Sequence, residues 1–402
     1  MATVIHGVGR LFTATERGTV ERAAVVLDGD RIAWVGADED LPPQLAAGAE
    51  EVDAGGGLVT PGLIDAHTHP VYAGDRHAEI ARRSAGASYA EIASLGGGIA
   101  STVAATRAAG ADPLRAAVRA RLAGWLAAGT TTMEVKTGYA LDREGELAQV
   151  RLLAGLADDP ALPRLAVTFL GAHAVPPERA GRQAAYATEV AGWCPDAAAA
   201  GARFVDVFCD EGYFTLDETR EICAAGRAAG LVPRLHADEL ARTGGALLAA
   251  EVGAASADHL LRITDDDAAA LAAAGVVAVL APGTALAMGT MPPARALLDA
   301  GATVALATDH NPGTCGMTGM SLVVALAVAG LRMSVGEALL AATAGGAAAL
   351  RRADVGVVAP GYLADLVLWD AAHEGAFAWA YGLRPLRVWR GGAAALVGPV
   401  SG

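Results

Sequence analysis

Short apolar runs alternate with amphipathic stretches through the middle of the chain, from about residue 59 to residue 350. Regular alternation of strands and helices is typical of a parallel sheet, and eight repeats are enough to close it into a barrel. The pattern therefore predicts a (β/α)8 barrel. Its strands are predicted at Leu58–His69, Thr130–Lys136, Leu165–His173, Phe204–Cys209, Leu231–His236, Ala257–Leu260, Val276–Leu280 and Thr303–Asp309.

The alternative fold is an open, doubly wound parallel sheet. Such a sheet favours a glycine-rich turn after its first strand. Here the corresponding position holds His67 and His69 instead. We therefore favour the closed barrel.

Amphipathic helices are predicted between these strands, and several have recognisable ends. The helix patterns cover Glu144–Ala157, Leu216–Ala229, Asp265–Ala274 and Pro292–Ala300. Threonines at the first positions predict N-caps, because their hydroxyls satisfy free backbone N–H groups; these are Thr215, Thr264 and Thr290. Glycines after the last turns predict left-handed C-termini; these are Gly230, Gly275 and Gly301.

Both ends of the chain have a strand pattern instead. Ala23–Leu27 and Arg31–Val35 are joined by Asp28-Gly29-Asp30, which indicates a hairpin. Leu363–Trp369 and Pro385–Trp389 have the same character. We predict that residues 1–58 and 351–402 together form a small β-sandwich, and that residues 59–350 form the catalytic barrel.

The composition favours a folded enzyme over a nucleic-acid or membrane protein. Of the 402 residues, 53% are hydrophobic and 18% are charged, which argues against disorder, and the net charge of −14 disfavours nucleic acid and anionic membranes as partners. The most apolar stretches are too short, or too interrupted by Pro282 and Gly283, to span a bilayer. Residues 1–22 have no secretory pattern, so we expect a cytoplasmic protein with reduced cysteines.

Polar, chemically competent residues follow almost every predicted strand, and four of them indicate a metal site. His67 and His69 stand two apart on a strand, so their side chains share a face. His236 and Asp309 lie at the tips of two other strands, and all tips of a parallel barrel meet at one rim. Three imidazoles and one carboxylate suit Zn²⁺ or Fe²⁺ better than Ca²⁺ or Mg²⁺.

A metal ion of this type lowers the pKa of bound water to about 7, and the reaction then needs a proton acceptor. Asp309, Glu239 and His259 are the candidates for the general base. His259 has a second interpretation, as a hydrogen-bond partner of a metal ligand. The sequence does not choose among the three.

An anionic substrate would need a local cation in so acidic a protein. Arg76 lies seven residues after His69, in a loop of the same rim, where it could bind a carboxylate through two hydrogen bonds. Tyr139 could add a hydroxyl from the next strand. Gly96-Gly97-Gly98 lacks the spacing of a phosphate loop, which favours a lid or a tight turn.

Together these motifs resemble the amidohydrolase superfamily and, within it, the imidazolonepropionase family. The narrowest similarities are Glu134-Val135-Lys136-Thr137-Gly138-Tyr139 and Asp309-His310-Asn311-Pro312-Gly313; broader ones are Asp65-Ala66-His67-Thr68-His69, His236-Ala237-Asp238-Glu239 and Asp258-His259. The similar segments run from about residue 60 to residue 315. His310 and the residues around 281–290 differ from the expected pattern, which affects the shape of the pocket rather than the metal site.

The resemblance implies an activity and a site. The activity is hydrolysis of 4-imidazolone-5-propanoate to N-formimidoyl-L-glutamate in histidine degradation, commonly by a homodimer. The implied ligands of a single Zn or Fe ion are His67, His69, His236 and Asp309, with Lys136 not a metal-bridging lysine. The implied substrate contacts are Arg76, Tyr139, His173, Glu239, Asn311, Gly313 and Thr314.

Two other functions are compatible with parts of the pattern. A mononuclear deaminase or deacetylase acting on another small molecule would use the same metal ligands, but a neutral substrate gives no reason for Arg76 together with Tyr139. A catalytically inactive assembly protein on this scaffold would be expected to lose its ligands, and all four are present here. An assay on the anionic heterocycle, combined with metal analysis, separates the three hypotheses.

Overall fold

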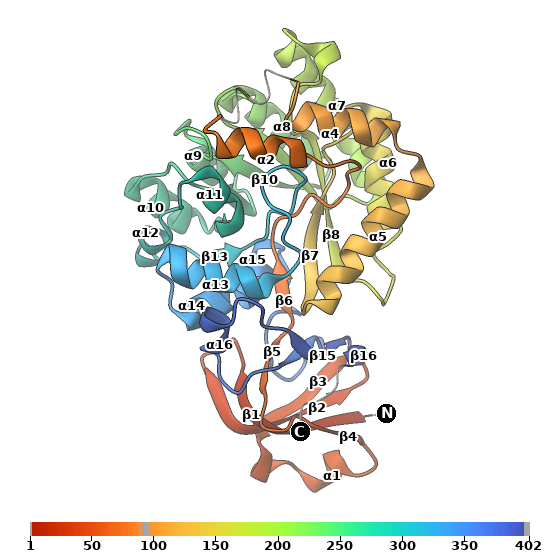
Figure 1. The fold of residues 1–402 in the computed structure, drawn as a ribbon, viewed down its shortest axis with the longest axis vertical. Helices are drawn as coiled ribbons and strands as arrows, with labels where there is room; N and C mark the ends of the chain where they lie inside the picture. Colours follow the sequence, from red (N-terminus) through yellow and green to blue (C-terminus); the bar gives the residue numbers. More distant parts are fainter. Residues whose placement is uncertain (1, 88–90, 92–95, 398–402) are drawn as a thin grey trace.

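Eight parallel strands follow one another around a nearly closed barrel in the computed structural model, which describes residues 2–87, 91 and 96–397 (Figure 1). The barrel strands are β6 (Leu63–Asp65), β7 (Thr130–Lys136), β8 (Arg164–Ala172), β9 (Phe204–Cys209), β10 (Val232–Ala237), β11 (Ser256–His259), β12 (Val277–Leu280) and β13 (Val304–Leu306). Beyond β13 and β6, the backbone N–H of Asp309 donates to the carbonyl of His67 at 3.0 Å, and that of His69 to His310 at 2.8 Å. The predicted barrel is confirmed, and the open sheet was the wrong alternative.

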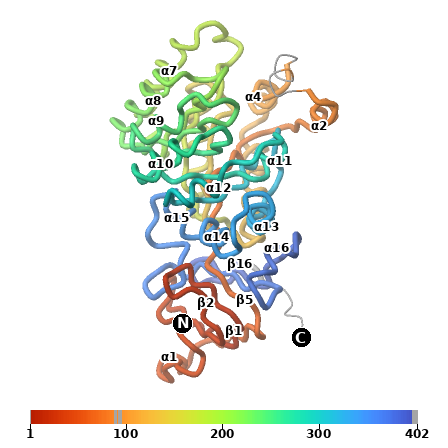
Figure 2. The backbone as a smooth tube through the Cα atoms, turned by 90° about the vertical axis from the view of Figure 1, so that its left-hand side faces the viewer, coloured from red at the N-terminus to blue at the C-terminus, as the bar shows by residue number. Residues whose placement is uncertain are grey.

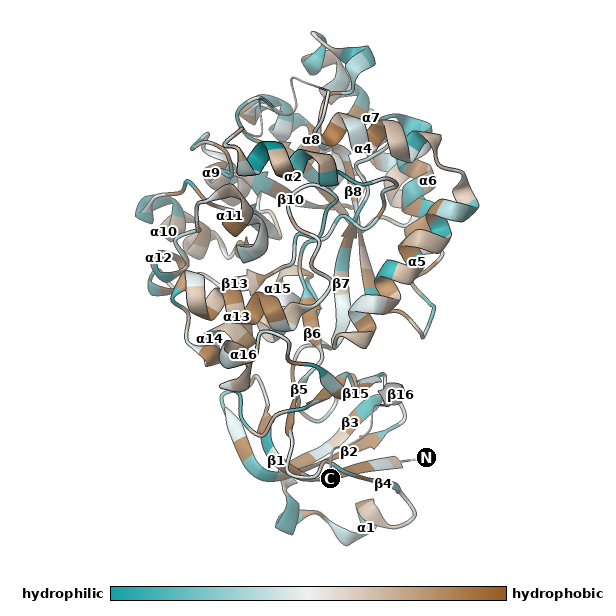
Figure 3. Cartoon of the chain, viewed as in Figure 1, coloured by the Kyte–Doolittle hydropathy of each residue, from teal (hydrophilic) through white to brown (hydrophobic). Residues whose placement is uncertain are grey.

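Helices surround the barrel strands. Those of the barrel are α2 (His77–Ser84), α4 (Ile99–Ala108), α5 (Ala111–Ala127), α6 (Arg143–Ala154), α7 (Gln183–Ala200), α8 (Leu216–Ala228), α9 (Gly245–Glu251), α10 (Asp265–Ala274), α11 (Pro282–Met288), α12 (Ala294–Asp299), α13 (Met320–Leu331), α14 (Val335–Leu340) and α15 (Gly346–Ala349). In Figure 3, α13 is coloured as hydrophobic, whereas α2, which lies over the rim, is largely hydrophilic. Within the part of the chain that the structure describes, no helix is long and apolar enough to cross a membrane.

Two of the three predicted threonine caps are confirmed. Thr215 and Thr264 each form a capping box, in which the hydroxyl accepts from the third helical N–H and an acidic side chain returns to the cap. Thr290 was a wrong prediction, because α12 begins at Ala294 after Pro293. The N–H of Thr290 instead donates to Ala285 at 3.1 Å and closes the end of α11.

The two threonines make a matched pair for a stability measurement. We expect Thr264→Ala to lower the free energy of unfolding by about 1 kcal/mol, the usual cost of losing an N-cap. Thr290→Ala should change it by less than about 0.5 kcal/mol, as a surface substitution away from a cap does. Chemical denaturation of both variants checks this, and equal losses would contradict the assignment of the caps.

The strands near both chain ends pair into a second sheet, which lies below the barrel (Figure 2). Its order is β16 (Ala393–Val397), β15 (Pro385–Arg390), β14 (Leu366–Trp369), β5 (Leu58–Pro61), β1 (Ala2–Phe12), β2 (Thr19–Asp28) and β3 (Arg31–Ala37), with β4 (Glu50–Asp53) beside β1. Strands β2 and β3 form the predicted hairpin. Apolar side chains from β1, β2, β5, β14 and β15 share one buried cluster. Two short helices, α1 (Pro43–Ala46) and α16 (Ala376–Trp379), complete the terminal parts.

The strand predicted at Leu58–His69 is in fact two strands in different sheets. Strand β5 pairs with β14 in the second sheet, and β6 pairs with β7 in the barrel. Gly62 separates them, and a Cβ there would lie only 2.0 Å from Oγ1 of Thr131. The chain can therefore pass from one sheet to the other only where a residue has no side chain.

Candidate active site

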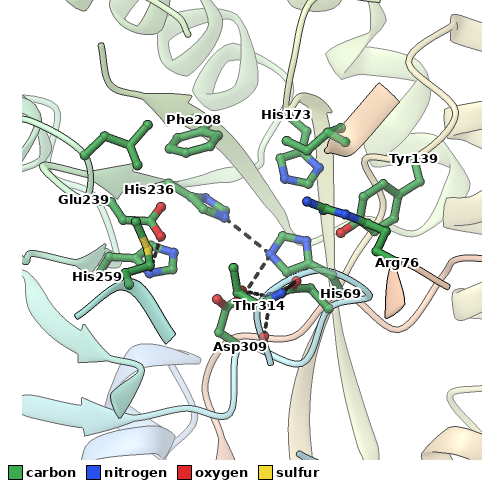
Figure 4. Close-up of a pocket in the computed structure, with 14 residues that line it drawn as sticks. His69, Arg76, Tyr139, His173, Phe208, His236, Glu239, His259, Asp309 and Thr314 are labelled. Carbon is green, nitrogen blue, oxygen red and sulfur yellow. Dashed lines mark hydrogen bonds and ion pairs between the residues drawn. The ribbon is translucent and has the colours of Figure 1, made fainter. Parts of the chain in front are cut away.

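The four predicted metal ligands meet at the carboxyl ends of the barrel strands (Figure 4). Nε2 of His69 lies 3.1 Å from Nε2 of His67 and 3.4 Å from Nε2 of His236. Oδ1 of Asp309 lies 3.5 Å from His67 Nε2 and 3.4 Å from His69 Nε2. All four side chains are buried. The spacing gathers these nitrogens and the oxygen into one cluster, in which His67, His69 and Asp309 form one close triplet and His236 belongs to two neighbouring ones.

Asp258 fixes the proton on His67. Oδ2 of Asp258 lies 2.5 Å from Nδ1 of His67, so the ring donates from Nδ1 and turns the lone pair of Nε2 toward the cluster. Burial, followed by the charge of Lys136, holds the pKa of His67 well below its ordinary value. Burial likewise lowers the pKa of His69 to about 4. Both rings are therefore neutral at pH 7, the form that binds metal.

Asp206 plays the corresponding part at His236. Its Oδ2 lies 3.1 Å from Nδ1 of His236. Burial alone would lower the pKa of His236, but the charge of Asp206 outweighs it and raises the pKa. Because Asp206 lies at Nδ1, the opposite nitrogen of the ring, Nε2, is turned toward the cluster.

Asp309 is the carboxylate of the cluster, and its surroundings keep it ionised. Burial would raise its pKa, but the contacts with His69 and His259 and a hydrogen bond from Thr284 outweigh that effect and lower the pKa. Oγ1 of Thr284 donates to Oδ2 at 2.6 Å. Asp309 has a φ of +47°, which is strained for a residue with a side chain and recurs at Asp238 and His259. Such strain concentrates at functional sites.

The charged groups buried in and beneath the cluster, Asp309 included, carry a net negative charge. Nζ of Lys136 lies 2.7 Å from both Oε1 of Glu134 and Oδ2 of Asp206, so its amine is held as a structural cation. Arg234 donates to Asp258 at 3.3 Å. Two cations (Lys136, Arg234) face four carboxylates (Glu134, Asp206, Asp258, Asp309), which leaves two formal negative charges. That charge suits a divalent cation at the cluster.

Two further imidazoles enlarge the cluster beyond the predicted ligand set. His173 stacks on His69 with ring centres 5.0 Å apart, and its Nδ1 lies 3.0 Å from the carbonyl of Gly138. Among the described residues, three overlapping triplets bring one ligand atom from each member within 4.8 Å: His67 with His236 and His259, His69 with His173 and His236, and His67 with His69 and Asp309. The chemistry of this donor set fits Zn or Fe.

A cavity opens directly above the cluster, and its lining contains most of the predicted substrate contacts. These are Arg76, Tyr139, His173, Glu239, Asn311 and Thr314, together with His69, His236, His259 and Asp309. In Figure 4 the guanidinium of Arg76 points toward the histidines, beside Tyr139. Gly313 packs closely against Arg76, because a Cβ added at this glycine would lie only 2.3 Å from Nη1 of Arg76. The strand tips and loops therefore bring a cation and the metal-type cluster to one cavity.

The loop after Asp309 uses its polar side chain to hold its own shape. Oδ1 of Asn311 accepts the N–H groups of Gly313 and Thr314 at 2.8 Å, and its Nδ2 donates to the carbonyl of Asp309. Asn311 thus lines the cavity while it fixes the two residues that follow it. These hydrogen bonds are local in sequence, because an Asn side chain readily bonds the backbone of the residue two positions later.

Glu239 lies beside His259 on one side of the cavity, with 3.7 Å between Oε1 and Nδ1 (Figure 4). Burial raises the pKa of Glu239, and the nearby charge of Asp309 adds to that rise. Asp210 holds this loop, because its carboxylate accepts the N–H groups of Glu239, Leu240 and Ala241. Glu239 and His259, the two candidate bases besides Asp309, therefore line the same cavity.

Several lining residues were not predicted from sequence. Apolar side chains form part of the wall: Ile99, Phe208, Leu240 and Met288. Thr284, which orients Asp309, and Asp258, which orients His67, were not assigned those roles. An apolar residue gives no sequence signal for a pocket, because the same residue types fill the core. Asp258, in contrast, directly precedes the predicted His259.

Comparisons with known proteins agree with this geometry. A model of the amidohydrolase family matches residues 218–394. Curated imidazolonepropionases from Streptomyces avermitilis and Streptomyces griseus are 47% and 45% identical to this chain. The first alignment covers 94% of this chain and 88% of the relative, and the second covers 98% and 97%.

Solved structures of low sequence identity share the fold. A 5-methylcytosine deaminase from Klebsiella pneumoniae superposes with a TM-score of 0.74 at 16% identity, covering 99% of this chain and 98% of that one. A mutant atrazine chlorohydrolase from Arthrobacter aurescens, complexed with zinc and atraton, gives 0.71 at 20% identity, covering 98% and 95%. With the family model and the curated relatives, the barrel fold shows this protein to be an amidohydrolase. At the identity of its curated relatives, the chain belongs to the imidazolonepropionase family, and it is a hydrolase.

Proposed function

We propose that the chain hydrolyses 4-imidazolone-5-propanoate to N-formimidoyl-L-glutamate, a step of histidine degradation. The observation that carries the proposal is the shared cavity, in which Arg76 stands opposite a cluster of metal-binding type. The substrate combines an anionic propionate with a reactive cyclic amide, so it needs a cation and a hydrolytic centre at once. Family membership supports the same reaction.

The proposed metal ligands are His67, His69, His236 and Asp309, holding one Zn or Fe ion per chain. When bound, such an ion acidifies a coordinated water and polarises a carbonyl. The buried carboxylates and the neutral rings of His67 and His69 support a divalent ion at this position.

The residues of the chain then supply proton transfer and orientation. Water adds to the ring carbonyl carbon, the adjacent C–N bond breaks, and the ring nitrogen takes up a proton. We assign Asp309 as the acceptor of the proton from water, because it is ionised and held in place by Thr284. Glu239 and His259, 3.7 Å apart, are the alternatives and could deliver the proton to nitrogen.

Arg76 and Tyr139 are proposed to hold the propionate, with His173, Asn311 and Thr314 lining the same cavity. Gly313, also a proposed contact, packs against Arg76. We assign catalysis to the barrel unit, predicted as residues 59–350, supported by a unit predicted as 1–58 and 351–402; residues 59–61 belong to β5 and so to the second unit. A homodimer in the cytoplasm is part of the proposal. The four cysteines are all free and buried, which suits a reducing compartment.

Replacement of Arg76 tests the substrate class. We expect Arg76→Met to lower kcat/KM for imidazolonepropionate by roughly 30- to 700-fold, or about 2–4 kcal/mol, the scale for losing a buried charged hydrogen-bond pair. Most of the loss should be in KM, because the propionate is remote from the reacting carbonyl and binds alike in the ground and transition states. Steady-state kinetics of both proteins give the two constants separately.

An analogue without the carboxylate is the control. It should be a poor substrate of the native enzyme and nearly indifferent to Arg76→Met. If both proteins handle charged and neutral compounds equally, Arg76 is not the propionate site, and a deaminase acting on a neutral heterocycle becomes the better hypothesis.

A further inference from the structure

Arg76 is held between an acidic side chain and a glycine. Its Nε donates to Oε2 of Glu79 at 2.9 Å, and its Nη2 lies 2.8 Å from the same oxygen. The backbone of Gly313 packs against the guanidinium so closely that a Cβ added at Gly313 would lie 2.3 Å from Nη1 of Arg76. Arg76 and Glu79 are only 6% and 7% exposed. The guanidinium therefore has little freedom to turn.

The contacts with Glu79 fix the direction in which the guanidinium faces. Nε and Nη2 lie on the same side of the planar group, and both are directed at Oε2 of Glu79. The end of the group formed by Nη1 and Nη2 is the other edge at which Arg can bind a carboxylate through two parallel bonds. Glu79 thus sets which edge of Arg76 is presented to a bound anion.

Glu79 is itself anchored away from Arg76. Its second oxygen, Oε1, accepts the backbone N–H of Gly98 at 2.8 Å. Gly98 precedes α4, and the next residue, Ile99, lines the cavity. Burial would raise the pKa of Glu79, but the hydrogen bonds from Arg76 and Gly98 outweigh it and lower the pKa. The carboxylate is therefore a charged bridge between α2 and the start of α4.

We infer that Glu79 is a positioning residue for substrate recognition, which orients Arg76 for a carboxylate bound in the cavity. The inference rests on the proposed function, in which Arg76 binds the propionate. A simple charge pair makes the opposite prediction: Glu79 would compete with the substrate for Arg76, so its neutralisation would strengthen binding. The direction of the change in KM separates the two roles.

A double-mutant cycle with Glu79→Gln and Arg76→Met tests the inference. We expect Glu79→Gln to raise KM for imidazolonepropionate at least tenfold while kcat changes less than threefold, because the amide keeps one acceptor but weakens the hold on Arg76. In the Arg76→Met background the same substitution should change KM less than twofold, since no guanidinium remains to be oriented. The analogue without a carboxylate should respond to neither substitution.

The control is a similar ion pair outside the cavity. Arg179 donates from Nε and Nη2 to Glu189 at 3.0–3.2 Å. Glu189→Gln should leave both kinetic constants and the metal content unchanged. If Glu79→Gln does not fold, Glu79→Asp serves instead, because the shorter side chain cannot reach Arg76 and Gly98 together and should raise KM in the same way.

Two results would overturn the inference. One is a KM that falls or stays constant in the Glu79 variants, and the other is an equal rise with and without Arg76, which indicates a general structural role. Failure of the proposed function looks different, because Arg76→Met alone would then leave KM for the anionic substrate unchanged.

Discussion

His236→Ala is expected to abolish both the bound metal and the activity. Nε2 of His236 lies 3.4 Å from that of His69, so its removal opens one side of the cluster and leaves the carboxylate of Asp206 without its partner. A site built from three imidazoles and one carboxylate then has too few donors to hold the ion tightly. Elemental analysis of the purified variant, together with its turnover, measures both effects.

The native protein and an unrelated histidine variant provide the comparison. One equivalent of divalent metal per chain is expected for the native protein and for His373→Ala, whose side chain is 68% exposed. His67→Ala should behave as His236→Ala does. Two tightly held ions per native chain, or full activity after exhaustive chelation, would contradict a site with a single metal ion.

The strand tips could be predicted from the sequence because barrel geometry converts order along the chain into proximity. His67, His236 and Asp309 are far apart in sequence, yet each follows an apolar run. Parallel strands place all such positions at one rim. The fold class and the convergence of the four metal-type residues therefore followed from periodicity and the kind of residue at each tip.

The partners of these residues could not be predicted in the same way. Asp258, 191 residues from His67, makes the shortest contact with its ring, and no local pattern links the two. The sign of the pKa shift of His236 likewise depends on Asp206 rather than on burial alone. Such pairings depend on the register between strands, which periodicity does not determine.

Two predictions of secondary structure were wrong because the deciding feature was a single residue or a neighbouring helix. The predicted strand Leu58–His69 combined two sheets, because both halves are apolar and only Gly62 separates them. Thr290 has the residue type of a cap but belongs to the end of the preceding helix. The pair Arg76 and Glu79 was detectable in principle, since the residues are three apart at a helix start, where such side chains meet.

Asp309→Asn is expected to lower kcat by roughly 10³- to 10⁴-fold, or about 4–5.5 kcal/mol, while the fold is retained. The substitution preserves size, so the hydrogen bond from Thr284 and the position of the loop can persist. A carboxamide, however, has no negative charge to balance a divalent ion and accepts no proton from water near pH 7. The variant thus loses the base and the charge together.

Turnover must be compared at equal metal content, because Asp309 lies 3.4–3.5 Å from the nitrogens of His67 and His69 and is also a proposed ligand. Asp299→Asn, at a side chain 67% exposed on α12, is the matched control and should keep native kcat. Near-normal turnover in a metal-loaded Asp309→Asn protein would assign the base elsewhere. Glu239→Gln and His259→Gln would then decide between the two remaining candidates, since the one that carries the proton alone should show the loss that Asp309→Asn did not.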